Sequence, residues 1–199
     1  PQKSSEWSRL KQKEIEQRSE FRVTDKLMDS ALNQTLPSTS RLNAVRLLSQ
    51  HFKSLPNNFI EKISNSESEE IRGQAAWLIG IRGKSEHKTI LKLLNDPEPF
   101  VRRRATEALM RMPDKMADNA LIQFLDDPDR FVSYSAMVAL SHRPTSEYFS
   151  LSKKINKPKV LIRLLVAAHL RKERPTTSES TNIISNLLRN FNLNNEDQL

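Results

Sequence analysis

The stretch that decides the fold is LNDPEPFVRRRATEAL, from Leu94 to Leu109, which recurs 31 residues later as LDDPDRFVSYSAMVAL, from Leu125 to Leu140. Self-similarity at a fixed period of roughly 20 to 50 residues is typical of repeat architectures. Shifts of 30 or 31 residues reveal the same pattern upstream and downstream. The related positions are Ala44 and Leu47-Leu48; Ile71, Ala75 and Leu78-Ile79; and Pro158, Leu161-Ile162, Val166 and His169-Leu170. The chain therefore contains five copies.

Each copy predicts a pair of helices. Apolar residues at i, i+4, i+7 and i+8, such as Val101, Ala105, Ala108 and Leu109, lie on one stripe of an α-helix and not on one side of a strand. A shorter amphipathic stretch precedes each of these helices in the middle copies. We expect helix pairs near residues 21–51, 56–81, 84–111, 114–142 and 145–172.

Small residues recur where neighbouring helix pairs would touch, including Ala75, Ala105 and Ala136. Alanine at a helix–helix contact allows two backbones to approach closely. Because one helix pair cannot cover its own apolar side, the copies must stack on each other. The sequence thus predicts an all-α fold, a right-handed α-solenoid of about five helix pairs with terminal capping helices.

The turn inside each copy carries Asp-Pro, at Asp96-Pro97 and Asp127-Pro128. We expect the aspartate to cap the second helix and the proline to occupy its first turn. A carboxylate that repeats with the period has a structural role, because a catalytic group is needed once. Arg72, Arg102 and Arg163 share one repeat position, which Ser133 interrupts, and we expect these arginines to pair with the turn aspartates of an adjacent copy.

The ends differ from the array at residues 21–175. Residues 1–20 are rich in charge, with Trp7 as the main apolar anchor, and predict a capping helix or a linker. Residues 176–191 predict a terminal helix, the first of a sixth copy, and residues 192–199 predict a frayed tail. Since the chain opens on Pro1 and a polar segment, we expect it to be a piece of a longer protein.

Asp96-Pro97 followed by Phe100-Val101-Arg102 and by Ala105 to Leu109 resembles the HEAT repeat, and specifically the short bacterial variety named after phycobilisome lyases. The resemblance covers about residues 40–172 and implies a fold more than an activity. Residues 126–132 and 162–167 also look like the HEAT segments of large planctomycete-type proteins. Those segments join a sugar-dehydrogenase-like region to a cytochrome c region. The haem-attachment motif Cys-x-x-Cys-His does not occur in this sequence, so no redox role carries over.

The composition argues against several kinds of chemistry. The 199 residues include no cysteine, 3 glycines without phosphate-loop spacing, and 4 histidines without partners at metal-site spacing. No nucleophile motif such as Gly-x-Ser-x-Gly occurs. The longest apolar runs have about five residues, against roughly 20 for a bilayer span. We therefore expect no enzyme activity, no metal, no cofactor and no membrane-spanning segment.

Most of the net charge of +8 comes from one segment of the chain. Residues 153–174 include eight basic residues and one acidic residue, Glu173. Seven of these basic residues are possible contacts for an acidic partner: Lys153, Lys154, Lys157, Lys159, Arg171, Lys172 and Arg174. Arg103 and Arg104 lie beyond the expected arginine series and are possible groove contacts. Trp77 fits either the core or a groove wall, and the sequence favours the core.

Three functions remain open. The first is a non-catalytic scaffold that binds a protein partner or holds flanking domains of the same chain. The alternative is a nucleic-acid-binding module that uses the basic cluster at residues 153–174. The third is an accessory subunit resembling bilin lyases. The compartment stays open as well: periplasmic or exported if the planctomycete-type resemblance holds, and otherwise cytoplasmic.

Overall fold

The computed structural model describes residues 23–51, 55–82, 87–112, 115–144, 152, 155–170 and 177–190, and the regular elements in these ranges are α-helices. The predicted N-terminal segment 1–20 with Trp7, and the tail at 192–199, lie outside the described residues. The chain divides into two compact units, Pro1–Ala75 and Ala76–Leu199. The division falls within one helix, α4 (Glu69–Arg82).

The first unit contains helical residues 23–32, α2 (Ser38–His51), α3 (Asn57–Ile63) and the first half of α4. At the start of α4, the hydroxyl of Ser68 accepts a hydrogen bond from the Ile71 amide at 3.4 Å and donates to Glu70 at 2.6 Å. This hydroxyl, followed by a backbone amide, lowers the pKa of the Glu70 carboxyl. The apolar core of the first unit contains Ala31, Val45, Leu48, Phe59, Ile60, Ile63, Ile71 and Ala75.

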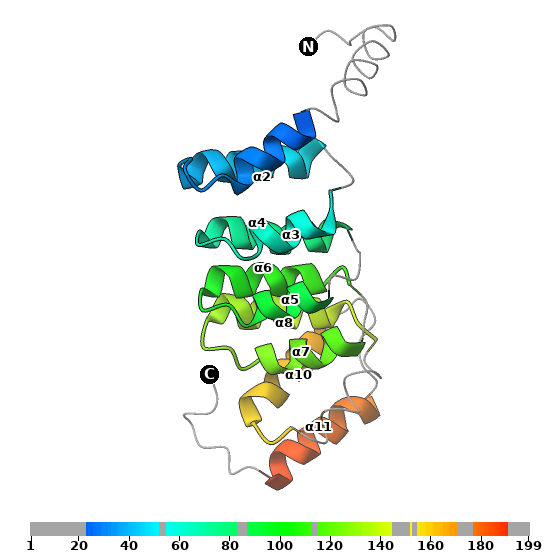
Figure 1. Cartoon of the computed structure of the whole chain (residues 1–199). Coiled ribbons are helices and arrows are strands. Elements are labelled where there is room, and N and C mark those ends of the chain that lie inside the picture. The colour runs from blue at the N-terminus through cyan, green and yellow to red at the C-terminus, as the bar shows by residue number, and fades with distance from the viewer. Residues whose placement is uncertain are drawn as a thin grey trace, which may run out of the picture. The chain divides into compact units, whose positions relative to one another are not determined.

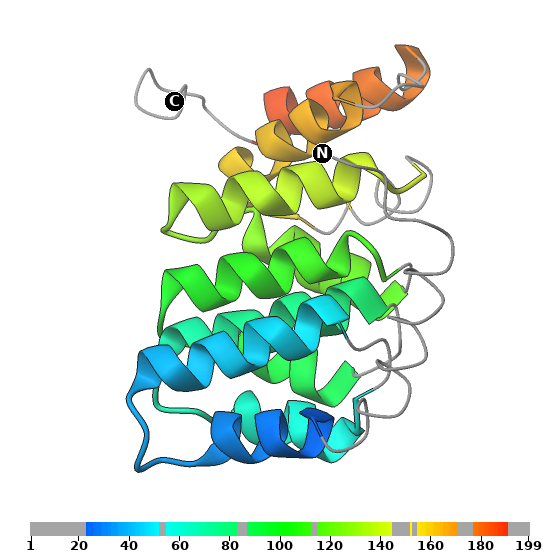
Figure 2. The same ribbon diagram turned by 90° about the horizontal axis from the view of Figure 1, so that it is seen from above.

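The second unit continues with α5 (His87–Leu94), α6 (Pro99–Leu109), α7 (Lys115–Phe124), α8 (Arg130–Ser141), α10 (Pro158–His169) and α11 (Thr177–Asn190). Helix α6 packs on α5 and on α8, and α8 packs on α7 and on α10. Figure 1 and the turned view in Figure 2 show α6, α8 and α10 as successive neighbours. These second helices of consecutive copies therefore form a row.

Equivalent residues of the copies occupy equivalent buried places. Ala105 and Ala136 are fully buried, and so are Val101 and Val132 one turn earlier. The backbones approach closely at one point, because a Cβ built on Gly80 would lie 2.7 Å from the Cα of Ala108. Only glycine fits at that contact without a shift of one helix. The small residues predicted from the repeat thus lie where the helices meet.

The turn aspartates do not cap helices, contrary to the sequence prediction. Helix α6 begins at Pro99 and α8 at Arg130, so Asp96 and Asp127 lie three residues before the first helical residue. Each carboxylate instead accepts a hydrogen bond from the amide two residues later, at 3.0 Å and 2.8 Å. This hydrogen bond between the side chain and the backbone closes the turn before the helix starts.

The N-cap position falls two residues after each of these aspartates. In α8 it is Asp129, whose Oδ1 accepts from the amides of Phe131 at 2.9 Å and Val132 at 3.0 Å. In α6 the equivalent residue is Glu98, which makes no side-chain capping bond. The longer glutamate side chain is a poor match for the capping geometry that aspartate adopts.

The last described helix, α11, packs on α10. It buries Ile183 and Leu187, while Ile184 and Leu188 remain 46% and 71% exposed. One side of the helix therefore completes the core and the other carries apolar residues into solvent.

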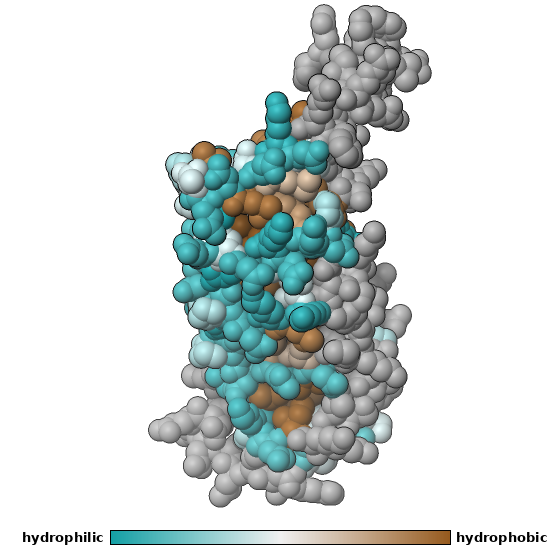
Figure 3. Space-filling view, viewed as in Figure 1, coloured by the Kyte–Doolittle hydropathy of each residue, from teal (hydrophilic) through white to brown (hydrophobic). Residues whose placement is uncertain are grey.

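The surface in Figure 3 is mixed: hydrophilic side chains cover most of the described area, with hydrophobic patches between them. None of the described helices has the length and apolar character needed to cross a membrane.

Candidate partner-binding surface

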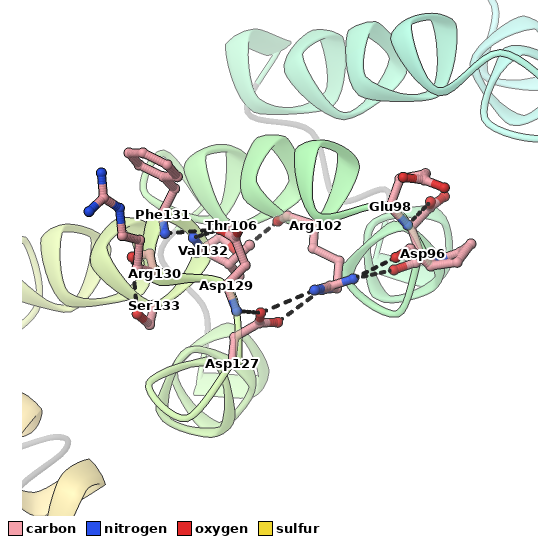
Figure 4. Close-up of polar contacts among 11 residues, drawn as sticks. Asp96, Glu98, Arg102, Thr106, Asp127, Asp129, Arg130, Phe131, Val132 and Ser133 are labelled. Atoms are coloured by element: carbon pink, nitrogen blue, oxygen red, sulfur yellow. Dashed lines mark hydrogen bonds and ion pairs between the residues drawn. The ribbon is translucent and has the colours of Figure 1, made fainter.

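Arg102 joins two consecutive turns (Figure 4). Its Nη1 donates to the backbone carbonyls of Asp96 and Pro97 in its own turn, at 2.9 Å each. Its Nε and Nη2 donate to the two carboxylate oxygens of Asp127 in the next turn, at 2.9 Å and 3.1 Å. The side chain is 14% exposed and that of Asp127 is 5% exposed. The Asp127 carboxylate raises the pKa of Arg102 above its ordinary value, so the guanidinium is charged.

The other two arginines of the series also donate to backbone carbonyls. Arg72 donates to the backbone carbonyls of Ser66 and Glu67 in its own turn, at 2.9 Å each. Arg163 donates to the carbonyl of Leu125 in the preceding copy and not to an aspartate. The prediction that these arginines pair with turn aspartates is wrong at Arg163, which binds a backbone carbonyl of the preceding copy instead.

A cavity of about 740 Å³ opens on the row of second helices. Its lining residues come from α4, α6, α8 and α10, together with two residues that follow α6. None of the described side chains of the first helices α5 and α7 is among its lining residues. We call the side of the second unit on which this cavity opens, lined by residues of α4, α6, α8 and α10, the second-helix face.

Five arginines line the cavity: Arg103, Arg104, Arg111, Arg130 and Arg163. Glu107 is the acidic residue among the lining side chains. Its two carboxylate oxygens accept from Arg103 at 2.8 Å and from Arg104 at 3.1 Å. The predicted groove contacts Arg103 and Arg104 are thus brought to one site, and both are more than one-third exposed. The lining is strongly cationic.

Aromatic rings accompany these cations. The guanidinium of Arg130 lies 4.6 Å from the centre of the Phe131 ring, and that of Arg103 lies 5.8 Å from the same ring. Phe131 is 49% exposed and Tyr134 is 58% exposed, and both line the cavity. A large aromatic surface left in water on a folded domain is typical of an interaction site.

Trp77 also lines the cavity and is partly exposed. The sequence prediction that it belongs to the core is wrong. Its neighbours Ala76 and Leu78 are buried, and the tryptophan lies on the edge of the apolar stripe of α4. Three further apolar residues of the lining, Met110, Met137 and Val138, are called the apolar floor below.

Sequence reasoning missed the aromatic part of this site. Phe100 and Phe131 were matched as members of the repeat, yet both are exposed and the adjacent valines fill the core. The sequence did contain an indication of their exposure, because each phenylalanine lies one residue before the valine at which the buried stripe starts. A large apolar residue that recurs at the same position in two copies, but lies outside the buried stripe, could have revealed the aromatic part of the site.

The predicted basic cluster is only partly described. Lys153, Lys154, Arg171, Lys172 and Arg174 lie outside the described residues. Lys157 pairs with Asp126 of the preceding turn, although its side chain stays 68% exposed. Lys159 is exposed on the first turn of α10.

The histidines do not form a metal site in the described ranges, where no three His, Cys, Asp or Glu side chains gather around a common point. His142 is the C-cap of α8. His169 is exposed, and its Nδ1 lies 2.8 Å from the Leu165 carbonyl. His169 is the last residue of α10.

One buried ion pair was not anticipated from the sequence. Arg143 Nε donates to Asp118 Oδ1 at 2.8 Å, and Nη2 donates to the carbonyls of Leu109 and Met112 at 2.6 Å each. Both side chains are 6% exposed. The arginine connects the end of α8 to α7 of the same copy and to the end of α6 in the preceding copy, and it has a structural role.

Stacked helix pairs with equivalent core residues define the class of protein: an α-solenoid of helical repeats. Residues 56–141 match the family model described as HEAT repeats. No curated protein sequence matches the chain. The specific phycobilisome-lyase or planctomycete-type context has no further support from these matches.

One solved structure supports the helical-repeat fold with a TM-score above 0.5, and two others are similar at lower scores. YibA of Escherichia coli aligns with a TM-score of 0.55 and 19% identity over 90% of this chain and 67% of its own. An engineered protein aligns with a TM-score of 0.47 and 20% identity, over 84% of this chain and 78% of its own. A chain from the Pds5–Scc1 complex, studied for cohesin function, aligns with a TM-score of 0.48 and 20% identity, over 88% of this chain and 31% of its own.

Proposed function

We propose that the chain is a non-catalytic scaffold that binds a protein partner through the second-helix face. The observation that carries the proposal is the cavity of about 740 Å³ with exposed aromatic side chains beside it. Stacked helical repeats present extended surfaces for binding. Binding sites between proteins are enriched in aromatic residues, methionine and arginine, and these residue types line the cavity.

The partner can be a separate protein or a flanking domain of a longer chain. The second form agrees with the planctomycete-type resemblance, in which HEAT segments join two functional regions. Lys157 and Lys159, which are the described lysines of the basic cluster, add positive charge at the start of α10 in the fifth copy. These finer statements, and the short bacterial variety of the repeat, remain proposals.

Site-specific photo-crosslinking tests the scaffold function. A photoreactive amino acid replaces Tyr134 on the second-helix face or, as a matched control, Gln123, an exposed residue of α7 that does not line the cavity. In an extract of the source cells we expect discrete protein adducts at position 134 that survive nuclease treatment, and few at position 123. Equal labelling at both positions, or loss of the adducts with nuclease, would contradict the proposal.

A further inference from the structure

We propose that the cavity on the second-helix face takes a short acidic peptide segment that carries one large apolar residue beside its carboxylates. This inference rests on the proposed function, because it names the chemistry of the partner at the same site. It depends on three features of the lining: its charge, an internal carboxylate that already occupies two of its arginines, and its apolar floor.

The charge selects an anion. Five arginines and one glutamate line the cavity, and Arg111 and Arg130 are exposed. Like charges gathered around a concave surface raise the local concentration of ligands of the opposite sign. A basic or neutral segment would gain nothing from this arrangement.

Glu107 shows which anion the arginines accept. Its carboxylate bridges Arg103 and Arg104 at 2.8 Å and 3.1 Å, which are normal lengths for charge-assisted hydrogen bonds. The same molecule pairs Arg102 with the Asp127 carboxylate through two bonds. The planar guanidinium fits a planar carboxylate, and Arg130 lies on the rim with its guanidinium over the Phe131 ring.

The apolar floor requires an apolar side chain on the ligand. Met110, Met137 and Val138 line the cavity together with Trp77. Methionine is flexible and polarisable, and adapts to a side chain inserted against it. A nucleic-acid backbone carries no apolar side chain that would cover this floor. The geometry therefore favours a peptide over a nucleic acid.

Fluorescence anisotropy with the full 199-residue chain tests the inference. The probes are labelled 12-residue peptides: one of Asp and Glu with a central Trp, one of Asp and Glu alone, and one with Lys in place of the acids. A single-stranded and a duplex oligonucleotide complete the set. We expect the acidic Trp peptide to bind at least about tenfold more tightly than the other two peptides, with affinity that falls as salt rises.

Charge reversal locates the site. Arg130→Glu should weaken binding of the acidic Trp peptide by about tenfold or more, whereas Lys88→Glu, the same charge change at an exposed residue of α5, should change it less than about twofold. Circular dichroism of both variants checks that they are folded.

Three outcomes would overturn the inference: no preference for the acidic Trp peptide, equal effects of the two substitutions, or tighter binding of an oligonucleotide with a steep salt dependence. If the peptides fail while the adducts at position 134 persist, the inference is wrong and the scaffold function stands. If both fail, the scaffold function is wrong as well.

Discussion

Arg102 makes two hydrogen bonds to carbonyls of its own turn and two to the carboxylate of Asp127 in the next. It thereby compensates the desolvation of a nearly buried carboxylate and of two backbone groups at once. A buried ion pair adds little over a well-packed apolar pair, but loss of one partner leaves the other charge uncompensated. The side chain therefore fixes how one turn lies against the next.

The first prediction concerns this residue. Arg102→Met should lower the free energy of unfolding by about 3 kcal/mol, because it strands the Asp127 carboxylate and the carbonyls of Asp96 and Pro97. Arg103→Met, one residue later and 47% exposed, should cost less than about 0.5 kcal/mol. Urea denaturation followed by circular dichroism measures both. Similar midpoints for the two variants would show that the link between turns contributes little.

At the scale of a helix, α6 and α8 share a buried stripe and the Asp-Pro turn that precedes them, but differ in how they begin. Asp129 satisfies two free amides of α8, while Glu98 satisfies none of α6. This difference separates two parts of the Asp-Pro-x turn: the first aspartate closes the turn, and the residue two places later caps the helix.

Replacement of the cap is the second prediction. Asp129→Ala should destabilise the protein by about 1 kcal/mol, because the amides of Phe131 and Val132 lose their acceptor. Glu98→Ala, at the equivalent position, should change stability by less than about 0.5 kcal/mol. Thermal denaturation of the two variants and the parent compares them. A larger loss for Glu98→Ala than for Asp129→Ala would contradict the assignment of the cap.

The sequence predicted the all-α repeat fold and the buried alanines because periodicity indicates directly which residues are buried. It placed the cap two residues too early, since Asp-Pro is compatible with either a cap or a turn closed by its own aspartate. It assigned Trp77 to the core because spacing cannot distinguish the centre of a buried stripe from its edge. The cavity depends on side chains from four helices, and one repeat alone contains no sign of it.

At the scale of the second unit, stability comes from contacts between neighbouring copies. Helices α6 and α8 are covered by packed helices on more than one side, whereas the described contacts of α11 are with α10. In a repeat array, stability is close to a sum of such nearest-neighbour terms. The central helices should therefore open least often.

Hydrogen exchange gives the third prediction. Amides in α6 and α8 should exchange at least about tenfold more slowly than those in α11, where Ile184 and Leu188 are exposed. Mass spectrometry of the exchanged and digested chain measures the three helices in one sample, with α10 expected between them. Equal protection of α11 and α8 would mean that the terminal helix is held by contacts beyond those with α10.

The guanidinium groups over the phenylalanine rings have a further consequence for solubility. Phe131 lies beneath Arg130 and near Arg103, and Phe100 lies near Arg104 at 5.6 Å from its ring centre. Two identical molecules that met through these rings would bring cation against cation, and the repulsion would oppose their association. The exposed phenylalanine rings are therefore poor contacts between two copies of the chain unless an anion first neutralises the arginines beside them.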